Sequence, residues 1–134
     1  MRKIFITAIV SLLFLACAKE NQESHKMELD QNFVHVVYFW LNNPDNEADR
    51  EAFLTSLNKF MDNSEYAKTK FIGEPAKTPR DVVDNSWTYS LILSFPSKEA
   101  QDLYQKEPAH LKFIEESEAL WERVQVYDNV YYKK

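Results

Sequence analysis

The segment from Tyr104 to Phe113 places a phenol and an imidazole six residues apart, on either side of a predicted helix start at Pro108. A histidine exchanges protons near neutral pH, and a phenol hydroxyl can donate a hydrogen bond to an oxygen that develops negative charge. Tyr104 and His110 could therefore act as stabiliser and general base, or they could hold a ligand by hydrogen bonds.

Helical periodicity predicts that His110 points inward. With His110 at 0° and a step of about 100° per residue, Trp121 falls at about 20° and Ile114 at about 40°. Phe113, at about 300°, extends the same apolar arc. Ser117 falls at about 340° and adds a second polar group to this face. We therefore expect His110 and Ser117 to face an apolar interior.

Two further elements direct a hydrogen-bonding side chain inward. Tyr104 shares a helix face with Ala100 and Leu103, and His35 shares a strand face with Val37 and Phe39. A buried polar group without a partner costs about 1–3 kcal/mol, so each must bond to the protein, to water or to a ligand. The set predicts a ligand pocket lined by His35, Tyr104, His110 and Ser117. A satisfied core is the alternative, and for His35 a hydrogen bond within the sheet or a dimer interface is favoured.

We predict no metal site and no cofactor. A metal would need His110 together with Glu107 or Glu118, and no helical pair of histidines supports such a site. The sequence contains no phosphate-binding loop or dinucleotide fingerprint.

The elements that must position these side chains alternate in type along the chain. Strands are predicted over residues 33–41, 66–72, 87–95 and 124–132, a helix over 47–61, and two shorter helices after Ser97 and from Pro108. This order predicts an α+β fold of the ferredoxin-like, split βαβ type. It comprises a four-stranded antiparallel sheet with helices on one face.

Residues 33–41 are apolar on both strand faces, which leaves the second face of the sheet to be covered. A second copy of the chain is the simplest cover. We therefore expect a homodimer in which two sheets pack face to face as a dimeric α+β barrel.

The first sixteen residues have the pattern of a signal peptide. Arg2 and Lys3 precede an apolar run that ends in Phe14-Leu15-Ala16-Cys17, which resembles a bacterial lipobox. The resemblance implies cleavage after residue 16 and lipidation of Cys17, the only cysteine. It also implies a tether over residues 17–31, a domain over residues 32–134, and a location on the periplasmic or cell-surface face of a bacterial membrane. An ordinary secretory signal is the alternative.

The charge of the chain indicates no nucleic-acid partner. Its net charge is −5, and removal of Arg2 and Lys3 would change this to about −7. No basic stripe is present on the predicted elements.

Five segments in order resemble the stress-responsive dimeric α/β-barrel (Dabb) family. They are residues 35–39 (HVVYF), 71–75 (FIGEP), 89–95 (YSLILSF), 104–110 (YQKEPAH) and 124–128 (VQVYD). The resemblance implies a ferredoxin-like protomer that pairs into a barrel. In a plant polyketide cyclase of that family, a tyrosine and a histidine spaced like Tyr104 and His110 serve catalysis without a metal or organic cofactor. A histidine corresponding to His35 lines the same pocket.

Three functions follow as hypotheses. The first is a lipid-anchored dimer that binds a small, largely apolar ligand. The second is a cofactor-independent cyclase or isomerase, in which His110 is the general base, Tyr104 stabilises an enolate and His35 orients the substrate. The third is a non-catalytic, stress-protective dimer in which His35, Tyr104 and His110 are structural residues of the core.

Overall fold

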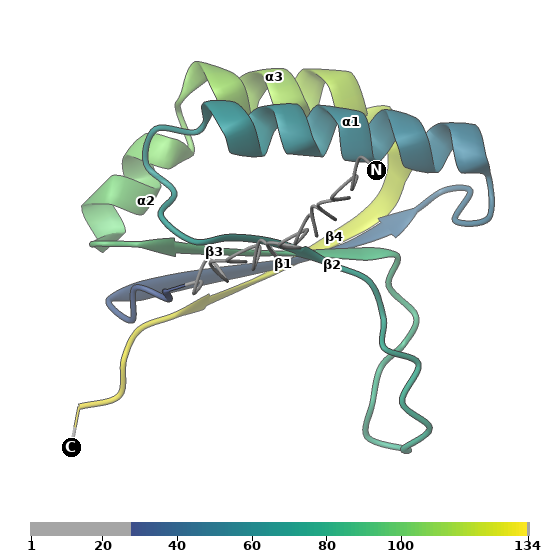
Figure 1. Ribbon diagram of the computed structural model, residues 1–134, viewed down its shortest axis with the longest axis horizontal. Helices are drawn as coiled ribbons and strands as arrows, with labels where there is room; N and C mark the ends of the chain where they lie inside the picture. Colours follow the sequence, from purple (N-terminus) through teal and green to yellow (C-terminus); the bar gives the residue numbers. More distant parts are fainter. Residues whose placement is uncertain (1–27, 134) are drawn as a thin grey trace, which may run out of the picture.

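Runs of alternating apolar residues build a four-stranded antiparallel sheet (Figure 1). The structure is a computed structural model, and it describes residues 28–133. The strands are β1 (Phe33–Leu41), β2 (Lys70–Gly73), β3 (Tyr89–Phe95) and β4 (Trp121–Asn129), in the order β2-β3-β1-β4. The two central strands, β3 and β1, carry the longest apolar segments, and β4 forms one edge.

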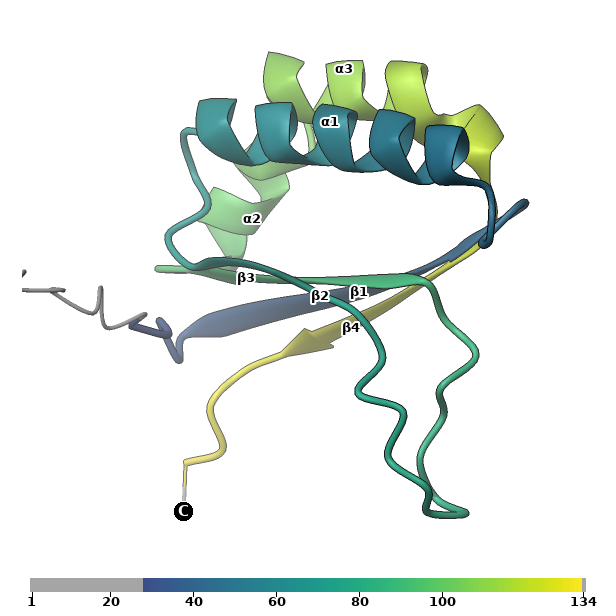
Figure 2. The ribbon, with the colours of Figure 1, turned by 45° about the vertical axis from the view of Figure 1, so that its right-hand side comes forward.

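Three helices cover one face of this sheet (Figure 2). They are α1 (Glu47–Asn63), α2 (Lys98–Tyr104) and α3 (Pro108–Ser117), and a 3-10 turn (Glu118–Leu120) follows α3. The Asp49 N–H donates to the Asn46 side chain, and the Ala100 N–H donates to the Ser97 hydroxyl, so α1 and α2 begin at capping residues. Pro108 occupies the first turn of α3. None of the helices within residues 28–133 is long and apolar enough to cross a bilayer.

The alternation in β1 decides which side chains meet the helices. Its odd-numbered residues, among them His35, Val37 and Phe39, are buried beneath the helices, whereas the even-numbered ones are only partly buried. Antiparallel pairing sets His35 opposite Leu93 of β3 on one side and Asp128 of β4 on the other. The helix-facing side of β1 thus positions His35 between two neighbouring strands.

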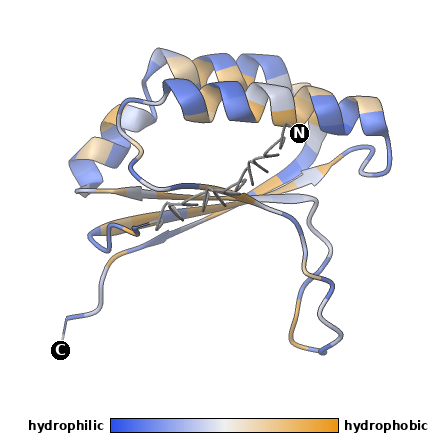
Figure 3. Ribbon diagram, viewed as in Figure 1, coloured by the Kyte–Doolittle hydropathy of each residue, from blue (hydrophilic) through white to orange (hydrophobic). Residues whose placement is uncertain are grey.

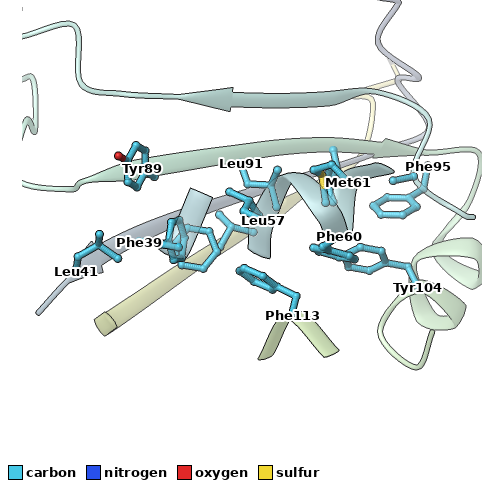
Figure 4. Close-up of a cluster of buried hydrophobic side chains, with 14 of the residues drawn as sticks. Phe39, Leu41, Leu57, Phe60, Met61, Tyr89, Leu91, Phe95, Tyr104 and Phe113 are labelled. Atoms are coloured by element: carbon cyan, nitrogen blue, oxygen red, sulfur yellow. The ribbon is translucent and has the colours of Figure 1, made fainter. Parts of the chain in front are cut away.

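The core fills the space between the helices and the sheet. In Figure 4, Phe60 of α1, Phe113 of α3 and Tyr104 of α2 converge from the helical layer on Phe39 and other side chains of the sheet. The Phe60 and Phe113 rings are stacked, with centroids 5.3 Å apart. Hydrophobic and hydrophilic residues alternate along the helices in Figure 3, and the buried residues of α1 include Phe53, Leu57 and Phe60.

The opposite face of the sheet is partly covered by the loop between β2 and β3, which extends below the sheet in Figure 1. Trp87 of this loop packs edge-on against Tyr38, with ring centroids 5.0 Å apart. The Trp40 indole N–H donates to the Ser86 hydroxyl at 2.9 Å, and the Arg123 guanidinium lies 4.2 Å from the Trp40 ring centroid. Phe71 and Tyr127 remain 39% and 55% exposed on this face.

The predicted fold class is confirmed, and β1 has the predicted bounds. The prediction that Trp121 lies on the helix from Pro108 is wrong. α3 ends at Ser117, because the 3-10 turn redirects the chain, and Trp121 begins β4. The predicted signal peptide and Cys17 lie outside the described residues. Of the predicted tether, residues 28–31 hydrogen-bond to the domain: the Asp30 N–H donates to the Ser94 hydroxyl at 3.1 Å.

Candidate functional site

A cavity of about 300 Å³ lies between the helices and the sheet, and three predicted site residues line it. They are His35, Tyr104 and His110. The rest of the wall is mostly apolar and includes Val37, Phe39, Phe60, Phe113, Ile114 and Trp121. A groove of about 340 Å³ lies between α1 and α3 and also touches Phe60 and Phe113, but it contains none of the predicted site residues.

His110 enters the cavity from the first turn of α3. Its Nδ1 lies 3.2 Å from the carbonyl oxygen of Gln105. A carbonyl only accepts hydrogen bonds, so Nδ1 carries the proton and donates. Burial lowers the pKa of His110, while the Gln105 bond and the nearby Glu107 oppose that shift. The ring is therefore neutral at neutral pH, and its Nε2, which has no partner within residues 28–133, can act as an acceptor or base.

Tyr104, the last residue of α2, is 1% exposed and packs among aromatic rings. Its ring centroid lies 4.9 Å from that of His110 and 5.0 Å from that of Phe95. Within residues 28–133 the Tyr104 hydroxyl has no hydrogen-bond partner, although its side chain lines the cavity. Burial raises the pKa of Tyr104, and the carboxylates of Glu107 and Asp128 add to that rise. The phenol consequently stays protonated and remains a donor.

His35 reaches the cavity from β1, with its ring centroid 5.7 Å from that of Tyr104. The His35 Nδ1 lies 2.6 Å from the carboxylate of Asp128, so Nδ1–H donates to Asp128 and fixes the orientation of the ring. The Asp128 side chain is 46% exposed, whereas that of His35 is 5% exposed. Sequence reasoning assigned Asp128 no role at this site. The alternation of Val124, Val126 and Asp128 along one strand face was the signal that could have found it.

Ser117 does not line the cavity. It shares the inward face of α3 with His110 but lies two turns, or about 10 Å, further along the helix axis. Its side chain is fully buried, and its hydroxyl is enclosed without a partner among the described residues. The sequence-based inward direction is therefore observed, while the distance along the helix separates Ser117 from the other three residues.

Residues 33–131 match the family model described as the stress responsive A/B barrel domain. The match covers more than half of the chain and includes every residue that lines the cavity. The chain belongs to the stress responsive A/B barrel domain family.

Several solved structures have a similar fold. An Arabidopsis thaliana protein is 20% identical, with a TM-score of 0.63, and the match covers 76% of this chain and 97% of that one. A hydroxynitrile lyase from Passiflora edulis is 13% identical, with a TM-score of 0.65 and coverage of 78% and 97%. A dimeric ferredoxin-like protein of unknown function from Thermobifida fusca is 13% identical, with a TM-score of 0.61 and coverage of 74% and 90%. At these identities the similarity establishes the fold alone. No curated protein matches the chain.

In this A/B barrel domain the cavity offers two kinds of chemistry. His110 can accept a hydrogen bond or a proton at Nε2, and Tyr104 can donate a hydrogen bond from its hydroxyl. No group of three or more metal-ligating side chains occurs within residues 28–133. Glu107, which metal binding at His110 would involve, accepts hydrogen bonds from the Ser64 hydroxyl at 2.7 Å and the Glu65 N–H at 3.0 Å.

Proposed function

We propose that this protein is a lipid-anchored, homodimeric binding protein that takes a small, largely apolar ligand into the cavity between its helices and its sheet. The observation that carries the proposal is the Tyr104 hydroxyl. Tyr104 lines an apolar cavity of about 300 Å³, and among residues 28–133 its hydroxyl forms no hydrogen bond. Small-molecule sites commonly combine an apolar wall with a few polar groups that fix the orientation of the ligand.

The two imidazoles support this proposal because, among the described residues, each forms a hydrogen bond through only one of its ring nitrogens. His110 uses Nδ1 on the Gln105 carbonyl, and His35 uses Nδ1 on Asp128. Among the described residues, Nε2 of neither ring has a hydrogen-bond partner, so both atoms can meet a ligand. A ligand that occupies the cavity would recover hydrogen bonds worth about 0.5–1.5 kcal/mol each, in addition to burial of its apolar surface.

Ligand binding can be tested with His110→Ala and a matched variant on the same helix. A panel of small uncharged aromatic compounds would be titrated in a background of Trp40→Phe and Trp87→Phe, so that Trp121, which lines the cavity, reports binding by its fluorescence. His110→Ala should weaken binding while the dimer persists. Ser117→Ala should leave binding unchanged, since Ser117 lies outside the cavity. An unaltered response in His110→Ala would remove His110 from the site.

The dimer is proposed from the apolar side chains on the sheet face opposite the helices. Val36 and Tyr38 of β1 lie on this face, where Phe71 and Tyr127 are exposed. The similar protein from Thermobifida fusca is described as dimeric. Sedimentation analysis should give a dimer for the wild-type protein and a monomer for Val36→Asp, because a carboxylate would be buried without a partner between the two sheets.

The lipid anchor is proposed from the sequence Leu15-Ala16-Cys17 and the basic and apolar residues before it. Such an anchor would hold the domain at a bacterial membrane, outside the cytoplasm. Metabolic labelling with a fatty acid should label the wild-type chain in the membrane fraction. Cys17→Ser should be unlabelled and found in the soluble exported fraction. A labelled Cys17→Ser protein would rule out this anchor, and an unlabelled wild type would indicate an ordinary secretory signal.

A second candidate is a cofactor-independent cyclase or isomerase, and the pairing of His110 with Tyr104 favours it. The neutral His110 would take a proton from an acidic C–H group at Nε2. Tyr104 would donate to the carbonyl oxygen as negative charge develops, with His35 orienting the substrate. The fold is shared with a hydroxynitrile lyase, which indicates that this fold can hold an active site. Tyr104→Phe should then abolish turnover and retain the fold. A third candidate, a structural dimer, predicts instead that His110→Ala mainly destabilises folding.

A further inference from the structure

We infer that the cavity selects uncharged ligands that can donate a hydrogen bond, that it rejects carboxylates of the same size, and that Asp128 contributes to this selectivity. The inference rests on the proposed ligand-binding function and names the class of ligand. It follows from the charges around the cavity and from the hydrogen-bonding state of the groups that line it.

No lysine or arginine lines the cavity within the described part of the chain. The wall is built from apolar side chains, one amide from Gln105, one phenol and two imidazoles. An anion that enters such a site loses its hydration and finds no cation with which to pair. A neutral molecule of the same shape avoids this cost, so the wall itself favours uncharged ligands.

The pair formed by His35 and Asp128 offers no net positive charge in either protonation state. With a neutral imidazole the pair carries one negative charge, and with a protonated imidazole it carries none. Within residues 28–133, Asp128 forms no salt bridge with a lysine or arginine. The neutral-imidazole form of the pair therefore repels an anion, and the protonated form has no net charge with which to attract one.

Glu107 adds a second carboxylate at the N-terminus of α3. The positive end of a helix dipole attracts anions, but here the N-cap residue is itself an acid, although its side chain forms no capping hydrogen bond. Its hydrogen-bond donors are neutral, namely the Ser64 hydroxyl and the Glu65 N–H. Among the described residues Glu107 forms no salt bridge, so its charge disfavours an anion at this helix end.

The polar groups of the cavity also specify what a neutral ligand must offer. His110 presents an acceptor at Nε2, since its Nδ1 proton is committed to the Gln105 carbonyl. Tyr104 presents a hydroxyl that donates. A ligand with one N–H or O–H donor next to one carbonyl acceptor, such as a primary carboxamide on an apolar ring, matches both groups.

The test uses two probes of nearly identical shape, 4-ethylbenzamide and 4-ethylbenzoate, titrated near neutral pH into the mature full-length protein. Saturation-transfer NMR and isothermal titration calorimetry would give the two dissociation constants. We expect the amide to bind at least about tenfold more tightly than the carboxylate. Asp128→Asn keeps an acceptor for the His35 Nδ1 proton but removes the charge, and should reduce this ratio by at least about threefold. Glu122→Gln, an exposed acid on the same strand, should leave the ratio unchanged.

The outcomes separate this inference from the function on which it rests. If the carboxylate binds as tightly as the amide, charge selectivity is refuted while ligand binding stands. If neither probe binds, the proposed binding of small apolar ligands is refuted together with the inference. An unchanged ratio in Asp128→Asn refutes the role of that residue. Should this variant fail to fold, Glu107→Gln, which removes the other carboxylate, must reduce the ratio for the charge argument to survive.

Discussion

Replacing Tyr104 by phenylalanine distinguishes a hydroxyl that waits for a ligand from one that holds the core together. The ring would stay in place, packed within 5.0 Å of the Phe95 centroid and 5.5 Å of the Phe60 centroid. Only the hydroxyl would be lost, and no described residue bonds to it. We therefore expect Tyr104→Phe to fold with nearly unchanged stability.

The magnitude follows from the absence of a hydrogen-bonded partner among residues 28–133. Breaking a bond to a buried partner would cost about 1–3 kcal/mol, because that partner would be left unsatisfied. Tyr104→Phe leaves no such group behind, so the free energy of unfolding should fall by no more than about 0.5 kcal/mol. Tyr104→Ala, which also removes the ring, should lower it by about 3–5 kcal/mol. Binding of an uncharged ligand should weaken by up to about tenfold in Tyr104→Phe, the value of one hydrogen bond.

Urea denaturation of the two variants and the wild type, without ligand, would measure these differences. A change of 1 kcal/mol corresponds to about 4–8 °C in the melting temperature of a domain this small, so thermal melts provide a second readout. A loss of more than about 1.5 kcal/mol in Tyr104→Phe would mean that the hydroxyl holds a structural partner. His35, Tyr104 and His110 would then be structural residues of the core rather than a ligand site.

Three further predictions concern the other polar groups. Ser117→Ala should raise the free energy of unfolding by up to about 1 kcal/mol in urea denaturation, because it removes an enclosed hydroxyl without a described partner. Asp128→Ala should lower it by about 1–3 kcal/mol in the same assay, since the buried His35 Nδ1–H loses its 2.6 Å acceptor. Burial lowers the pKa of His110 below its ordinary 6.5, so the unfolded chain takes up a proton first on acidification. The stability of the wild type should therefore fall, relative to that of His110→Asn, as the pH drops below about 6.5.

The central strands could be predicted from the sequence because burial on one or both faces leaves a periodic signal. Residues 33–41 were predicted as a strand with the bounds that β1 has, and the helix predicted over residues 47–61 ends two residues later in the structure. Pro108 and Ser97 mark helix starts by their own chemistry, so α2 and α3 were also found. Helical periodicity predicts which side of a helix a residue occupies, and it correctly predicted that Ser117 faces inward. It does not predict which of the inward-facing residues line the same cavity, because that depends on their distance along the helix axis.

Contacts that depend on strand register could not be predicted from local patterns. The bond between His35 and Asp128 joins residues 93 apart in the sequence and requires the pairing of β1 with β4 in one register. Trp121 was assigned to the wrong element because its angle on an extended helix fits the apolar arc, yet a 3-10 turn ends that helix first. It nevertheless lines the same cavity, since β4 runs beneath α3 as the edge of the sheet.

The charges near the cavity affect the two leading candidate functions, ligand binding and enolate chemistry, in different ways. An enolate formed beside Tyr104 would place negative charge where burial, and in addition the carboxylates of Glu107 and Asp128, raise the pKa of the phenol. The field that opposes a phenolate opposes an enolate at the same position, so His110 would act as a base against that field. Binding a neutral ligand carries no such penalty and satisfies the same hydroxyl and the same Nε2. The charges that make the cavity a poor site for an anion are therefore the physical reason to favour binding over enolate chemistry in this chain.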